Sequence, residues 1–392
     1  MDEIRAQVNS LNDELIQARR WLHQHAELSF QEAQTSAYIE KWLHSLGDGL
    51  EISRPAGNSV LAVLKTGRPG PVIGFRADMD ALPMTEEHPF PYKSENPGVM
   101  HSCGHDGHTA IQLCAAKLLL GMKDQLCGEI RFFFQHAEEV PPGGAVEMVN
   151  AGAADGLEEI YGMHLSSNYP TGSFGIRYGA LTSATDRFDA VILGKGGHSS
   201  MPELCVDPIV IGSQFIVNLQ TVVSRNISAV DPAVVSTCMV NSGSAYNIIP
   251  EEMKITGSVR TFDPNTRAEM PKMIERILSG TAAAGGASYQ FNYSLGYASV
   301  FNDEKLTKNV EEVITSSFGE DHILKIDLLM PGEDFSAFLT KCPGCFVEVG
   351  ARSEEKGITA PHHNPAYLMD EDALPGAVEL FVRIALSRVK LP

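Results

Sequence analysis

Apolar residues recur near helical spacing over residues 4–46, with Leu11, Leu15 and Leu22 as examples, and this pattern predicts helices. Short apolar runs bounded by turn residues follow at 60–64, 72–75, 130–134 and 160–164, which predicts buried strands. Residues 109–120 are apolar enough for a buried helix between these strands. Strands that alternate with helices predict an α/β sheet covered on both faces.

The pattern changes between residues 183 and 295. Strands are predicted at 187–193, 233–240, 253–262 and 289–294, and helices at 208–223 and 270–278. This β-α-β-β-α-β order is the ferredoxin-like arrangement. The α/β pattern then resumes and ends in a helix at 372–388. We therefore predict a catalytic mixed-sheet α/β domain, residues 1–183 and 296–392, with an inserted ferredoxin-like α+β domain, residues 184–295.

The length and charge of the chain narrow the possible functions. Its 392 residues exceed what one hydrophobic core normally supports, so two domains are expected. A formal net charge of −19 without any Lys/Arg run argues against nucleic-acid binding. The polar start lacks the apolar core of a signal peptide, and no apolar stretch is long enough to span a bilayer. We expect a cytoplasmic protein with neither a nucleic-acid nor a membrane partner.

The seven cysteines form an odd, irregularly spaced set, which is not a secreted disulfide framework. Cys342 and Cys345 have the spacing of a redox or zinc pair. No second pair completes a zinc site, and no helical pattern follows as in thioredoxin-like motifs. We interpret both as small buried hydrophobic residues beside a strand.

A dense cluster of candidate metal ligands occupies residues 100–109, and its members are His101, Cys103, His105, Asp106 and His108. A second cluster, at 136–139, directly follows the apolar run 130–134 and ends in Glu138 and Glu139. Cys and His favour Zn, Ni, Co or Fe, while carboxylates keep Mn possible. The adjacent glutamates suggest that one holds metal and the other moves protons. This pattern indicates a metallohydrolase.

Six motifs that occur in order carry a resemblance to a known family, and they lie at residues 78–83, 101–108, 138–139, 196–199, 332–335 and 363–365. Together they resemble the M20 metallopeptidase family, in its amidohydrolase branch of N-acyl-amino-acid, hippurate and auxin-conjugate hydrolases. The resemblance covers nearly the whole chain. It implies a metal-dependent amidohydrolase that cleaves an N-acyl amino acid into a carboxylic acid and a free amino acid.

The resemblance also implies the metal ligands, which are Cys103, His105, Glu139, His164 and His363. They would hold divalent ions, two per subunit, of Mn, Zn, Ni or Co. We expect His164 at the end of a strand. His363 is preferred to His362, because the family's ligand directly precedes the small-residue–Pro step. Related branches carry His where Asp78 stands, which leaves open whether one ion or two are held firmly.

Glu138 is the implied general base, which takes a proton from a metal-activated water and later returns it to the leaving amine. Asp80 and Asp78 are expected on one face of a strand, where they would orient a ligand or the base. His101, His108 and Asp106 are open as further orienting residues.

The inserted domain is expected to supply three more site residues and to act as lid and dimer contact. His198 lies in a glycine-rich stretch, and the resemblance implies that it stabilises the oxyanion in its own or the partner subunit. A simple turn histidine is the alternative. Asn247 and Arg260 match substrate-binding positions, although Arg260 could equally be an exposed salt-bridging residue. The resemblance also implies a homodimer.

Two other functions stay open at this point. One is a dipeptidase or carboxypeptidase of the same superfamily, whose substrate has a free amino terminus. The other is an inactive homologue that binds metal or ligand. A serine hydrolase is disfavoured, because the chain has no Gly-x-Ser-x-Gly elbow.

Overall fold

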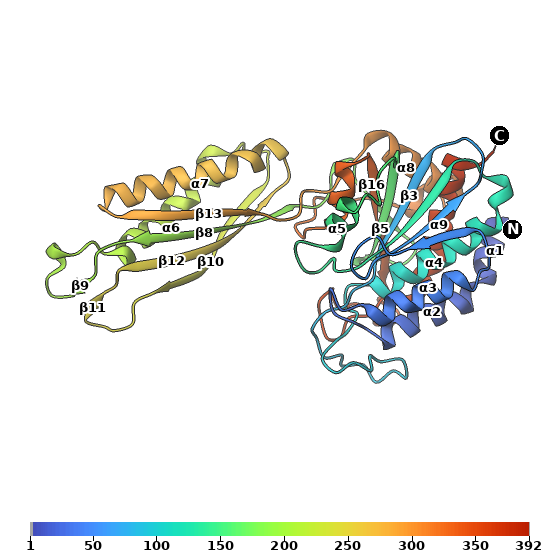
Figure 1. Ribbon diagram of the computed structural model, residues 1–392, viewed down its shortest axis with the longest axis horizontal. Coiled ribbons are helices and arrows are strands. Elements are labelled where there is room, and N and C mark those ends of the chain that lie inside the picture. The colour runs from blue at the N-terminus through green and yellow to red at the C-terminus, as the bar shows by residue number, and fades with distance from the viewer. Residues whose placement is uncertain (1–2, 392) are drawn as a thin grey trace. The chain divides into compact units, whose positions relative to one another are not determined.

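The computed structural model describes residues 3–391 and divides into two compact units (Figure 1). The first unit contains the chain up to Gly179, Phe301–Asp327 and the chain from Asp334 onward. The second unit contains Ala180–Val300 and Leu328–Glu333. Met1, Asp2 and Pro392, which the predicted catalytic domain includes, lie outside the described residues.

The first unit is built on an eight-stranded mixed sheet. Its strand order is β1 (Leu50–Ser53), β2 (Val60–Lys65), β4 (Glu129–Gln135), β3 (Val72–Asp78), β5 (Glu159–Pro170), β16 (Gly344–Arg352), β6 (Phe174–Ile176) and β15 (Ile323–Lys325). The central strands β4, β3, β5 and β16 run parallel to one another, whereas β1–β2, β2–β4 and β16–β6 pair antiparallel. This confirms the predicted mixed-sheet α/β class.

Helical segments cover both faces of this sheet. One face carries the mutually packed helices α1 (Glu3–Ser10), α2 (Asn12–Gln24), α4 (His105–Gly121), α8 (Glu304–Ser317) and α9 (Leu374–Val389), with α3 (Ala33–His44) beside α4 (Figure 1). The other face carries α5 (Gly144–Asn150) and the 3-10 segment Asp334–Thr340. Neighbouring residues of β4 show the two layers, because Phe132 stacks on Phe75 while Phe133 packs against Phe338.

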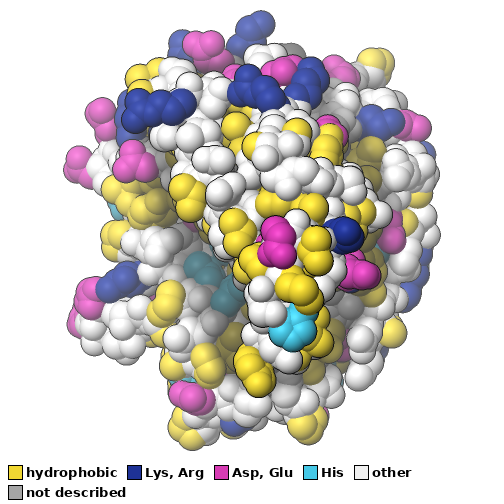
Figure 2. Space-filling model, turned by 90° about the vertical axis from the view of Figure 1, so that its left-hand side faces the viewer, with side chains coloured by type: hydrophobic (Ala, Val, Ile, Leu, Met, Phe, Trp, Pro, Cys, Tyr) yellow, Lys and Arg dark blue, Asp and Glu magenta, His cyan; other side chains and the backbone are white. Residues whose placement is uncertain are grey.

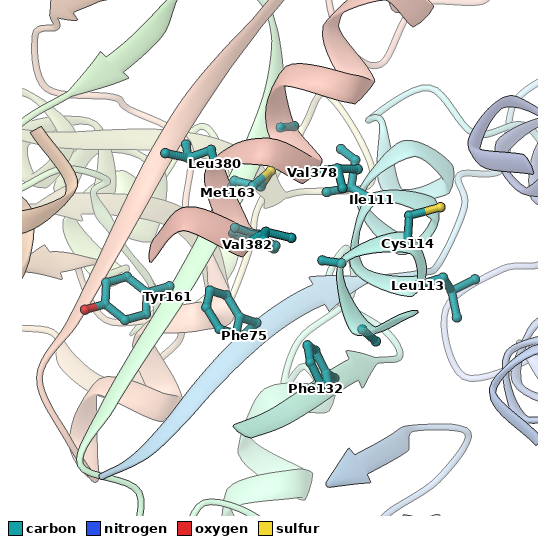
Figure 3. Close-up of a cluster of buried hydrophobic side chains, with 14 of the residues drawn as sticks. Phe75, Ile111, Leu113, Cys114, Phe132, Tyr161, Met163, Val378, Leu380 and Val382 are labelled. Atoms are coloured by element: carbon teal, nitrogen blue, oxygen red, sulfur yellow. The ribbon is translucent and has the colours of Figure 1, made fainter. Parts of the chain in front are cut away.

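The main core lies between the central strands and helices α4 and α9. The Phe75 ring lies 5.7 Å from that of Tyr161 and 4.9 Å from that of Phe381 on α9. Figure 3 shows Ile111 of α4 and Val382 of α9 turned toward the same cluster. Full burial of one such side chain contributes roughly 1.5–3 kcal/mol to the free energy of folding. This layer therefore holds in place the central strands, which position the site residues.

Three sequence predictions need correction in this unit. Helix α4 begins at His105 rather than Thr109, because its first turn is polar and shows no apolar pattern. Strand β5 continues to Pro170, so His164 lies within a strand and not at its end; the buried serines 166 and 167 interrupt the apolar run there. Strand β3 ends at Asp78, so strand alternation does not extend to Asp80.

The second unit has the predicted β-α-β-β-α-β order. Its elements are β8 (Ala184–Leu193), α6 (Pro208–Asn226), β10 (Ala233–Ser242), β12 (Glu252–Thr261), α7 (Pro264–Ala284) and β13 (Ser288–Leu295). The antiparallel sheet has the order β10-β12-β8-β13, which confirms the ferredoxin-like fold. Alternate residues of β8, Phe188 and Ile192 among them, are buried against the two helices.

Helix α7 is longer than the predicted segment 270–278. It begins directly after Asp263, whose carboxylate accepts hydrogen bonds from the N–H groups of Asn265 and Thr266. Asp207 caps α6 in the same way, and a proline follows each cap. An aspartate cap followed by proline is therefore the sequence signal for both starts.

Cys342 and Cys345 are buried free thiols beside and within β16, as predicted. Among residues 3–391, none of the helices combines the length and the apolar character that crossing a membrane would require.

Asp370 provides a pH-dependent stabilisation of the segment that leads into α9. Its carboxylate lies 2.6 Å from the Lys356 ammonium and accepts a hydrogen bond from the Thr171 hydroxyl at 2.9 Å. Burial alone would raise the pKa of Asp370, but Lys356, the Asp372 N–H and Thr171 lower it below the ordinary value.

Replacing Asp370 by asparagine is expected to lower the free energy of unfolding by about 1–2 kcal/mol at pH 7. Because the folded-state pKa is depressed, this contribution is present above the unfolded pKa of about 3.9 and is lost as the pH falls through the folded value. Urea unfolding of the wild type and of the Asp370→Asn variant, at pH 7 and at a series of pH values below 4, measures this difference in free energy. A difference that does not shrink on acidification would contradict this origin.

Candidate metal centre and active site

Cys103, His105 and His164 meet at the start of α4. Their ligand atoms lie within 4.8 Å of one another, and Cys103 Sγ is 3.4 Å from His164 Nε2. Gly104 makes this approach possible, because its φ of 96° is left-handed and a Cβ there would meet Tyr367 Oη at 3.2 Å. The loop before α4 therefore folds tightly enough to present both Cys103 and His105 to β5.

Glu139 and His363 join the same group from two other segments. Glu139 follows β4, and its Oε1 lies 3.2 Å from His363 Nε2. The His363 N–H donates to the carbonyl oxygen of Ser102 at 2.9 Å, which holds its loop against Cys103. Cys103, Glu139 and His363 again have ligand atoms within 4.8 Å of one another. The structure thus brings together all five predicted ligand positions.

The hydrogen bonds of His105 and His164 leave their Nε2 atoms facing this group. His105 Nδ1 pairs with Asp80 Oδ1 at 3.1 Å, and His164 Nδ1 donates to the Leu165 carbonyl oxygen at 3.0 Å. A histidine that donates from Nδ1 presents a lone pair at Nε2, which is the usual arrangement of a metal-binding imidazole.

The residues present fit a divalent metal ion. Among the described residues, His105 Nε2 and Glu139 Oε1 are buried atoms that form no hydrogen bond, and they lie 3.9 Å apart. Leaving such atoms unpaired is costly, and an ion between them would remove that cost. The donor set of sulfur, imidazole and carboxylate suits first-row transition metals and zinc.

The carboxylates around Cys103 and His105 also favour a positive charge at this position. Burial, followed by the Glu139, Glu138 and Asp78 carboxylates, raises the pKa of the Cys103 thiol well above its ordinary value. Only a nearby cation would keep that sulfur ionised. Burial alone lowers the pKa of His105, but Asp78 and Asp80 raise it to about 10. Either a proton or a metal ion therefore balances the carboxylates at this ring.

Asp80 connects a candidate ligand to the segment of the candidate base. Besides His105, it accepts hydrogen bonds from the Ser29 hydroxyl at 2.7 Å and from the Glu139 N–H at 3.0 Å. Burial raises the pKa of Asp80, but the bonds from His105, Ser29 and Glu139 outweigh it and lower the pKa overall. Asp80 therefore orients both the His105 ring and the backbone at Glu139.

Asp78 acts on a different histidine. Its Oδ1 pairs with His108 Nδ1 at 2.6 Å, while His108 Nε2 accepts the N–H of Leu165 at 2.8 Å. Both ring nitrogens of His108 are thus engaged, which leaves it no atom for a metal. His108 instead joins Asp78 to Leu165, the strand residue that follows His164.

A buried arginine holds Asp78 in place. Arg76 donates to Asp78 Oδ2 at 2.6 Å, to Gln135 Oε1 at 2.7 Å and to Asp334 Oδ1 at 2.7 Å. Burial raises the pKa of Asp78, but Arg76, His105 and His108 together hold it well below its ordinary value. A fully buried guanidinium needs such partners on several sides, so this network ties the ends of β3 and β4 to residue 334.

The remaining residues of the first cluster have other surroundings. Asp106 pairs with Arg19 at 3.0 Å and with His23 at 2.7 Å, in a network apart from the five ligand positions. His362 Nε2 accepts the N–H of Ser167 at 3.0 Å. His101 is buried, and neither ring nitrogen has a hydrogen-bond partner among the described residues.

The second unit brings together two of its three predicted site residues. His198 is exposed and lies in the short strand β9 (Gly197–His198), which pairs with β11 (Ile248–Ile249). The Ser199 N–H donates to the carbonyl oxygen of Asn247 at 3.2 Å, so Asn247 adjoins His198. Arg260 lies near the far end of β12, which begins at Glu252 soon after β11.

Comparison with known proteins decides the family. Residues 74–387 match the family model described as peptidase family M20/M25/M40. The chain belongs to this family. The matched range contains the five ligand positions and Glu138.

Individual M20 relatives resemble the chain over most of its length. An N-acyl-L-amino acid amidohydrolase of Geobacillus stearothermophilus is 48% identical over 301 residues, which cover 77% of this chain and 81% of that protein. An N-acetylcysteine deacetylase of Bacillus subtilis is 39% identical over 95% of this chain and 96% of its own length. The crystal structure of Bacillus subtilis YXEP protein, described as a dinuclear metal-binding peptidase of the M20 family, has a TM-score of 0.86 and 35% identity over 97% of this chain and 98% of that one.

Sequence reasoning missed two side chains that this M20 fold places next to the site, Arg76 and Gln135. A signal was available for Arg76, because a charged residue inside the apolar run of β3 is expensive to bury without partners. For Gln135, the last residue of β4, we find no comparable signal. Asp334 belongs to a motif that the sequence pointed out but to which it assigned no role.

Proposed function

We propose that this M20 chain is a metal-dependent amidohydrolase that cleaves N-acyl amino acids into a carboxylic acid and a free amino acid. The observation that carries the proposal is the overlap of the ligand groups. Each such group consists of three residues whose possible ligand atoms lie within 4.8 Å of one another. Cys103, His105 and Glu139 each belong to two or more of these groups. Glu138 forms a group with His105 and Glu139. Relatives whose names specify N-acyl-L-amino acids and N-acetylcysteine support the substrate class.

We assign the metal ligands as Cys103, His105, Glu139, His164 and His363, holding two divalent ions per subunit of Mn, Zn, Ni or Co. When bound, such ions act as Lewis acids that lower the pKa of water and polarise an amide carbonyl. Asp80 orients His105 and the Glu139 backbone, and Asp78 acts on the strand of His164 through His108.

Glu138 is the proposed general base. Its carboxylate is buried, and its ligand atom lies within 4.8 Å of those of His105 and Glu139. It would take a proton from the water that attacks the amide carbonyl carbon and pass that proton to the leaving nitrogen. The amide C–N bond then breaks, and a carboxylic acid and a free amine remain.

The second unit is proposed to act as lid and to bind the substrate. His198 Nδ1 accepts the Ser200 N–H at 3.1 Å, so a neutral His198 carries its proton on Nε2, where it can donate to a developing oxyanion. Asn247, which adjoins His198, would bind the substrate carbonyl. Arg260 would bind the substrate carboxylate with its planar fork.

We also propose a homodimer through the second unit, in the cytoplasm. Strand β10 is an edge strand with Val234, Met239 and Val240 exposed, and such edges favour pairing with another chain. Figure 2, seen from the side where β9 and β11 lie in Figure 1, shows hydrophobic side chains in yellow on the surface. The seven free thiols suit a reducing compartment.

A substrate panel tests the proposed activity. The purified protein is loaded separately with Mn, Zn, Ni or Co and assayed for free amine, with acyl and amino-acid sides varied independently. N-acyl amino acids are expected to turn over, and unblocked dipeptides with the same side chains are expected to do so far less. Hydrolysis of the unblocked dipeptides alone would favour the dipeptidase alternative. Failure of every amide with all four ions would favour an inactive, metal-binding homologue.

A further inference from the structure

The residue before the proposed base has an unusual backbone conformation. Ala137 has a φ of 51° and is fully buried. Residues with a Cβ rarely adopt this left-handed region, because the Cβ crowds the following carbonyl oxygen. Such a conformation persists only where the surroundings hold it, so something must fix the peptide that leads into Glu138.

Hydrogen bonds fix the backbone on both sides of Glu138. The Ala137 N–H donates to Glu32 Oε1 at 2.8 Å, and the Ala137 carbonyl oxygen accepts the Gly144 N–H at 3.0 Å. After Glu138, the Glu139 N–H donates to Asp80 at 3.0 Å. Glu138 therefore stands between two anchored residues, and Glu32 is the side chain that anchors the first.

Glu32 lies far from Ala137 in the sequence, and its carboxylate accepts hydrogen bonds from three different segments. It directly precedes α3 and is fully buried. Its Oε1 also accepts the N–H of Phe30, a second left-handed residue with a φ of 66°, at 2.9 Å. Its Oε2 accepts the Asn58 amide at 3.0 Å. Among the described residues, none of the candidate ligand groups includes Glu32.

We propose that Glu32 is a positioning residue, which holds Ala137 in its left-handed conformation and thereby sets the Glu138 carboxylate beside His105 and Glu139. The inference rests on the proposed function, in which Glu138 is the base. A base that is displaced by about 1 Å can cost on the order of 100-fold in rate. Glu32 would therefore affect turnover without touching substrate or metal.

Three variants distinguish this positioning role from a general effect on the stability of the fold. Glu32→Ala removes the acceptor and is expected to lower kcat by about 10- to 100-fold, with KM and metal content little changed. Glu32→Gln keeps an oxygen that can accept both N–H groups. Because burial raises the pKa of Glu32, a neutral amide is a mild replacement, and most of kcat is expected to return. Glu27→Ala is the matched control.

Glu27 is a suitable control because it is a buried carboxylate of the same segment that also binds α3. It accepts the N–H groups of Gln34 and Thr35 and the Thr35 hydroxyl. Its loss is expected to lower the melting temperature while kcat stays near the wild-type value. If Glu32→Ala does not fold, Glu32→Asp takes its place, because the shorter side chain withdraws the carboxylate from the Ala137 N–H.

Crystal structures of the wild type and the variants give a readout that does not depend on activity. In Glu32→Ala, Ala137 is expected to leave the left-handed region and Glu138 to shift, whereas Glu32→Gln keeps both in place. An unchanged Ala137 and Glu138 in Glu32→Ala would overturn the inference, as would a kcat equal to that of Glu27→Ala. An inactive wild type whose Ala137 still depends on Glu32 would reject the proposed function alone.

Discussion

Replacing Glu138 by glutamine is expected to lower kcat for an N-acyl amino acid by about 10²- to 10⁴-fold, the usual range for loss of a general base. Glutamine has nearly the shape of glutamate but cannot take a proton at neutral pH. The five ligand positions are unaltered by the change, so metal content and melting temperature should stay close to those of the wild type. Steady-state kinetics, elemental analysis and thermal unfolding on the same samples measure all three.

The exposed Glu320, in a short 3-10 turn of the first unit, provides the matched control. Glu320→Gln makes the same chemical change outside the candidate ligand groups, and it should leave kcat unchanged. If Glu138→Gln turned over at a rate near that of the control, Glu138 would have no part in proton transfer. A loss of metal in Glu138→Gln would instead indicate that Glu138 is a ligand.

Removing the metal is the second change with a large expected effect. Chelation should abolish hydrolysis, and one or more of Mn, Co, Ni and Zn should restore it. The same treatment should lower the melting temperature, because an ion that binds only the folded chain stabilises it by mass action. Without an ion, His105 Nε2 and Glu139 Oε1 form no hydrogen bond with the described residues. The negative charge of the carboxylates around Cys103 and His105 is then not balanced by a metal ion.

A variant of one ligand tests the same point without chelator. Cys103→Ala is expected to bind less metal and to lose at least about 100-fold in kcat. Cys127→Ala changes a partly buried free thiol of the same unit, outside the candidate ligand groups, and should behave like the wild type. Full activity and metal content in Cys103→Ala would remove the sulfur from the metal site. Activity that survives exhaustive chelation would argue against metal dependence altogether.

Much of the fold could be predicted from the sequence, because helices and strands impose their periods on the local pattern of apolar residues. The ferredoxin-like order of the second unit is the best case, since β8, β12 and β13 each show plain alternation. Two of the errors, in the start of α4 and in the length of β5, occurred where buried polar residues interrupt the pattern. The polar first turn of α4 and the serines within β5 are buried beside the site.

The candidate site was predictable in its residue types but not in its hydrogen bonds. Cys103, His105 and Glu139 stood out because their side chains suit a metal and lie in dense clusters. His105 and His108 could not be told apart in this way, because they are three residues apart in the same helix. Asp80 faces Nδ1 of the first and frees its Nε2, whereas Asp78 and the Leu165 N–H engage both nitrogens of the second.

By itself, the amino-acid sequence determined the class of fold, the order of the elements and the set of candidate metal-binding side chains, since these depend on local periodicity and on chemistry carried by each residue. Only the tertiary structure decided which nitrogen of each histidine is available, that Arg76 supports Asp78, and that Glu32 holds the left-handed Ala137 before Glu138. The physical reason is that hydrogen bonds between segments far apart in the chain leave no periodic trace in either segment.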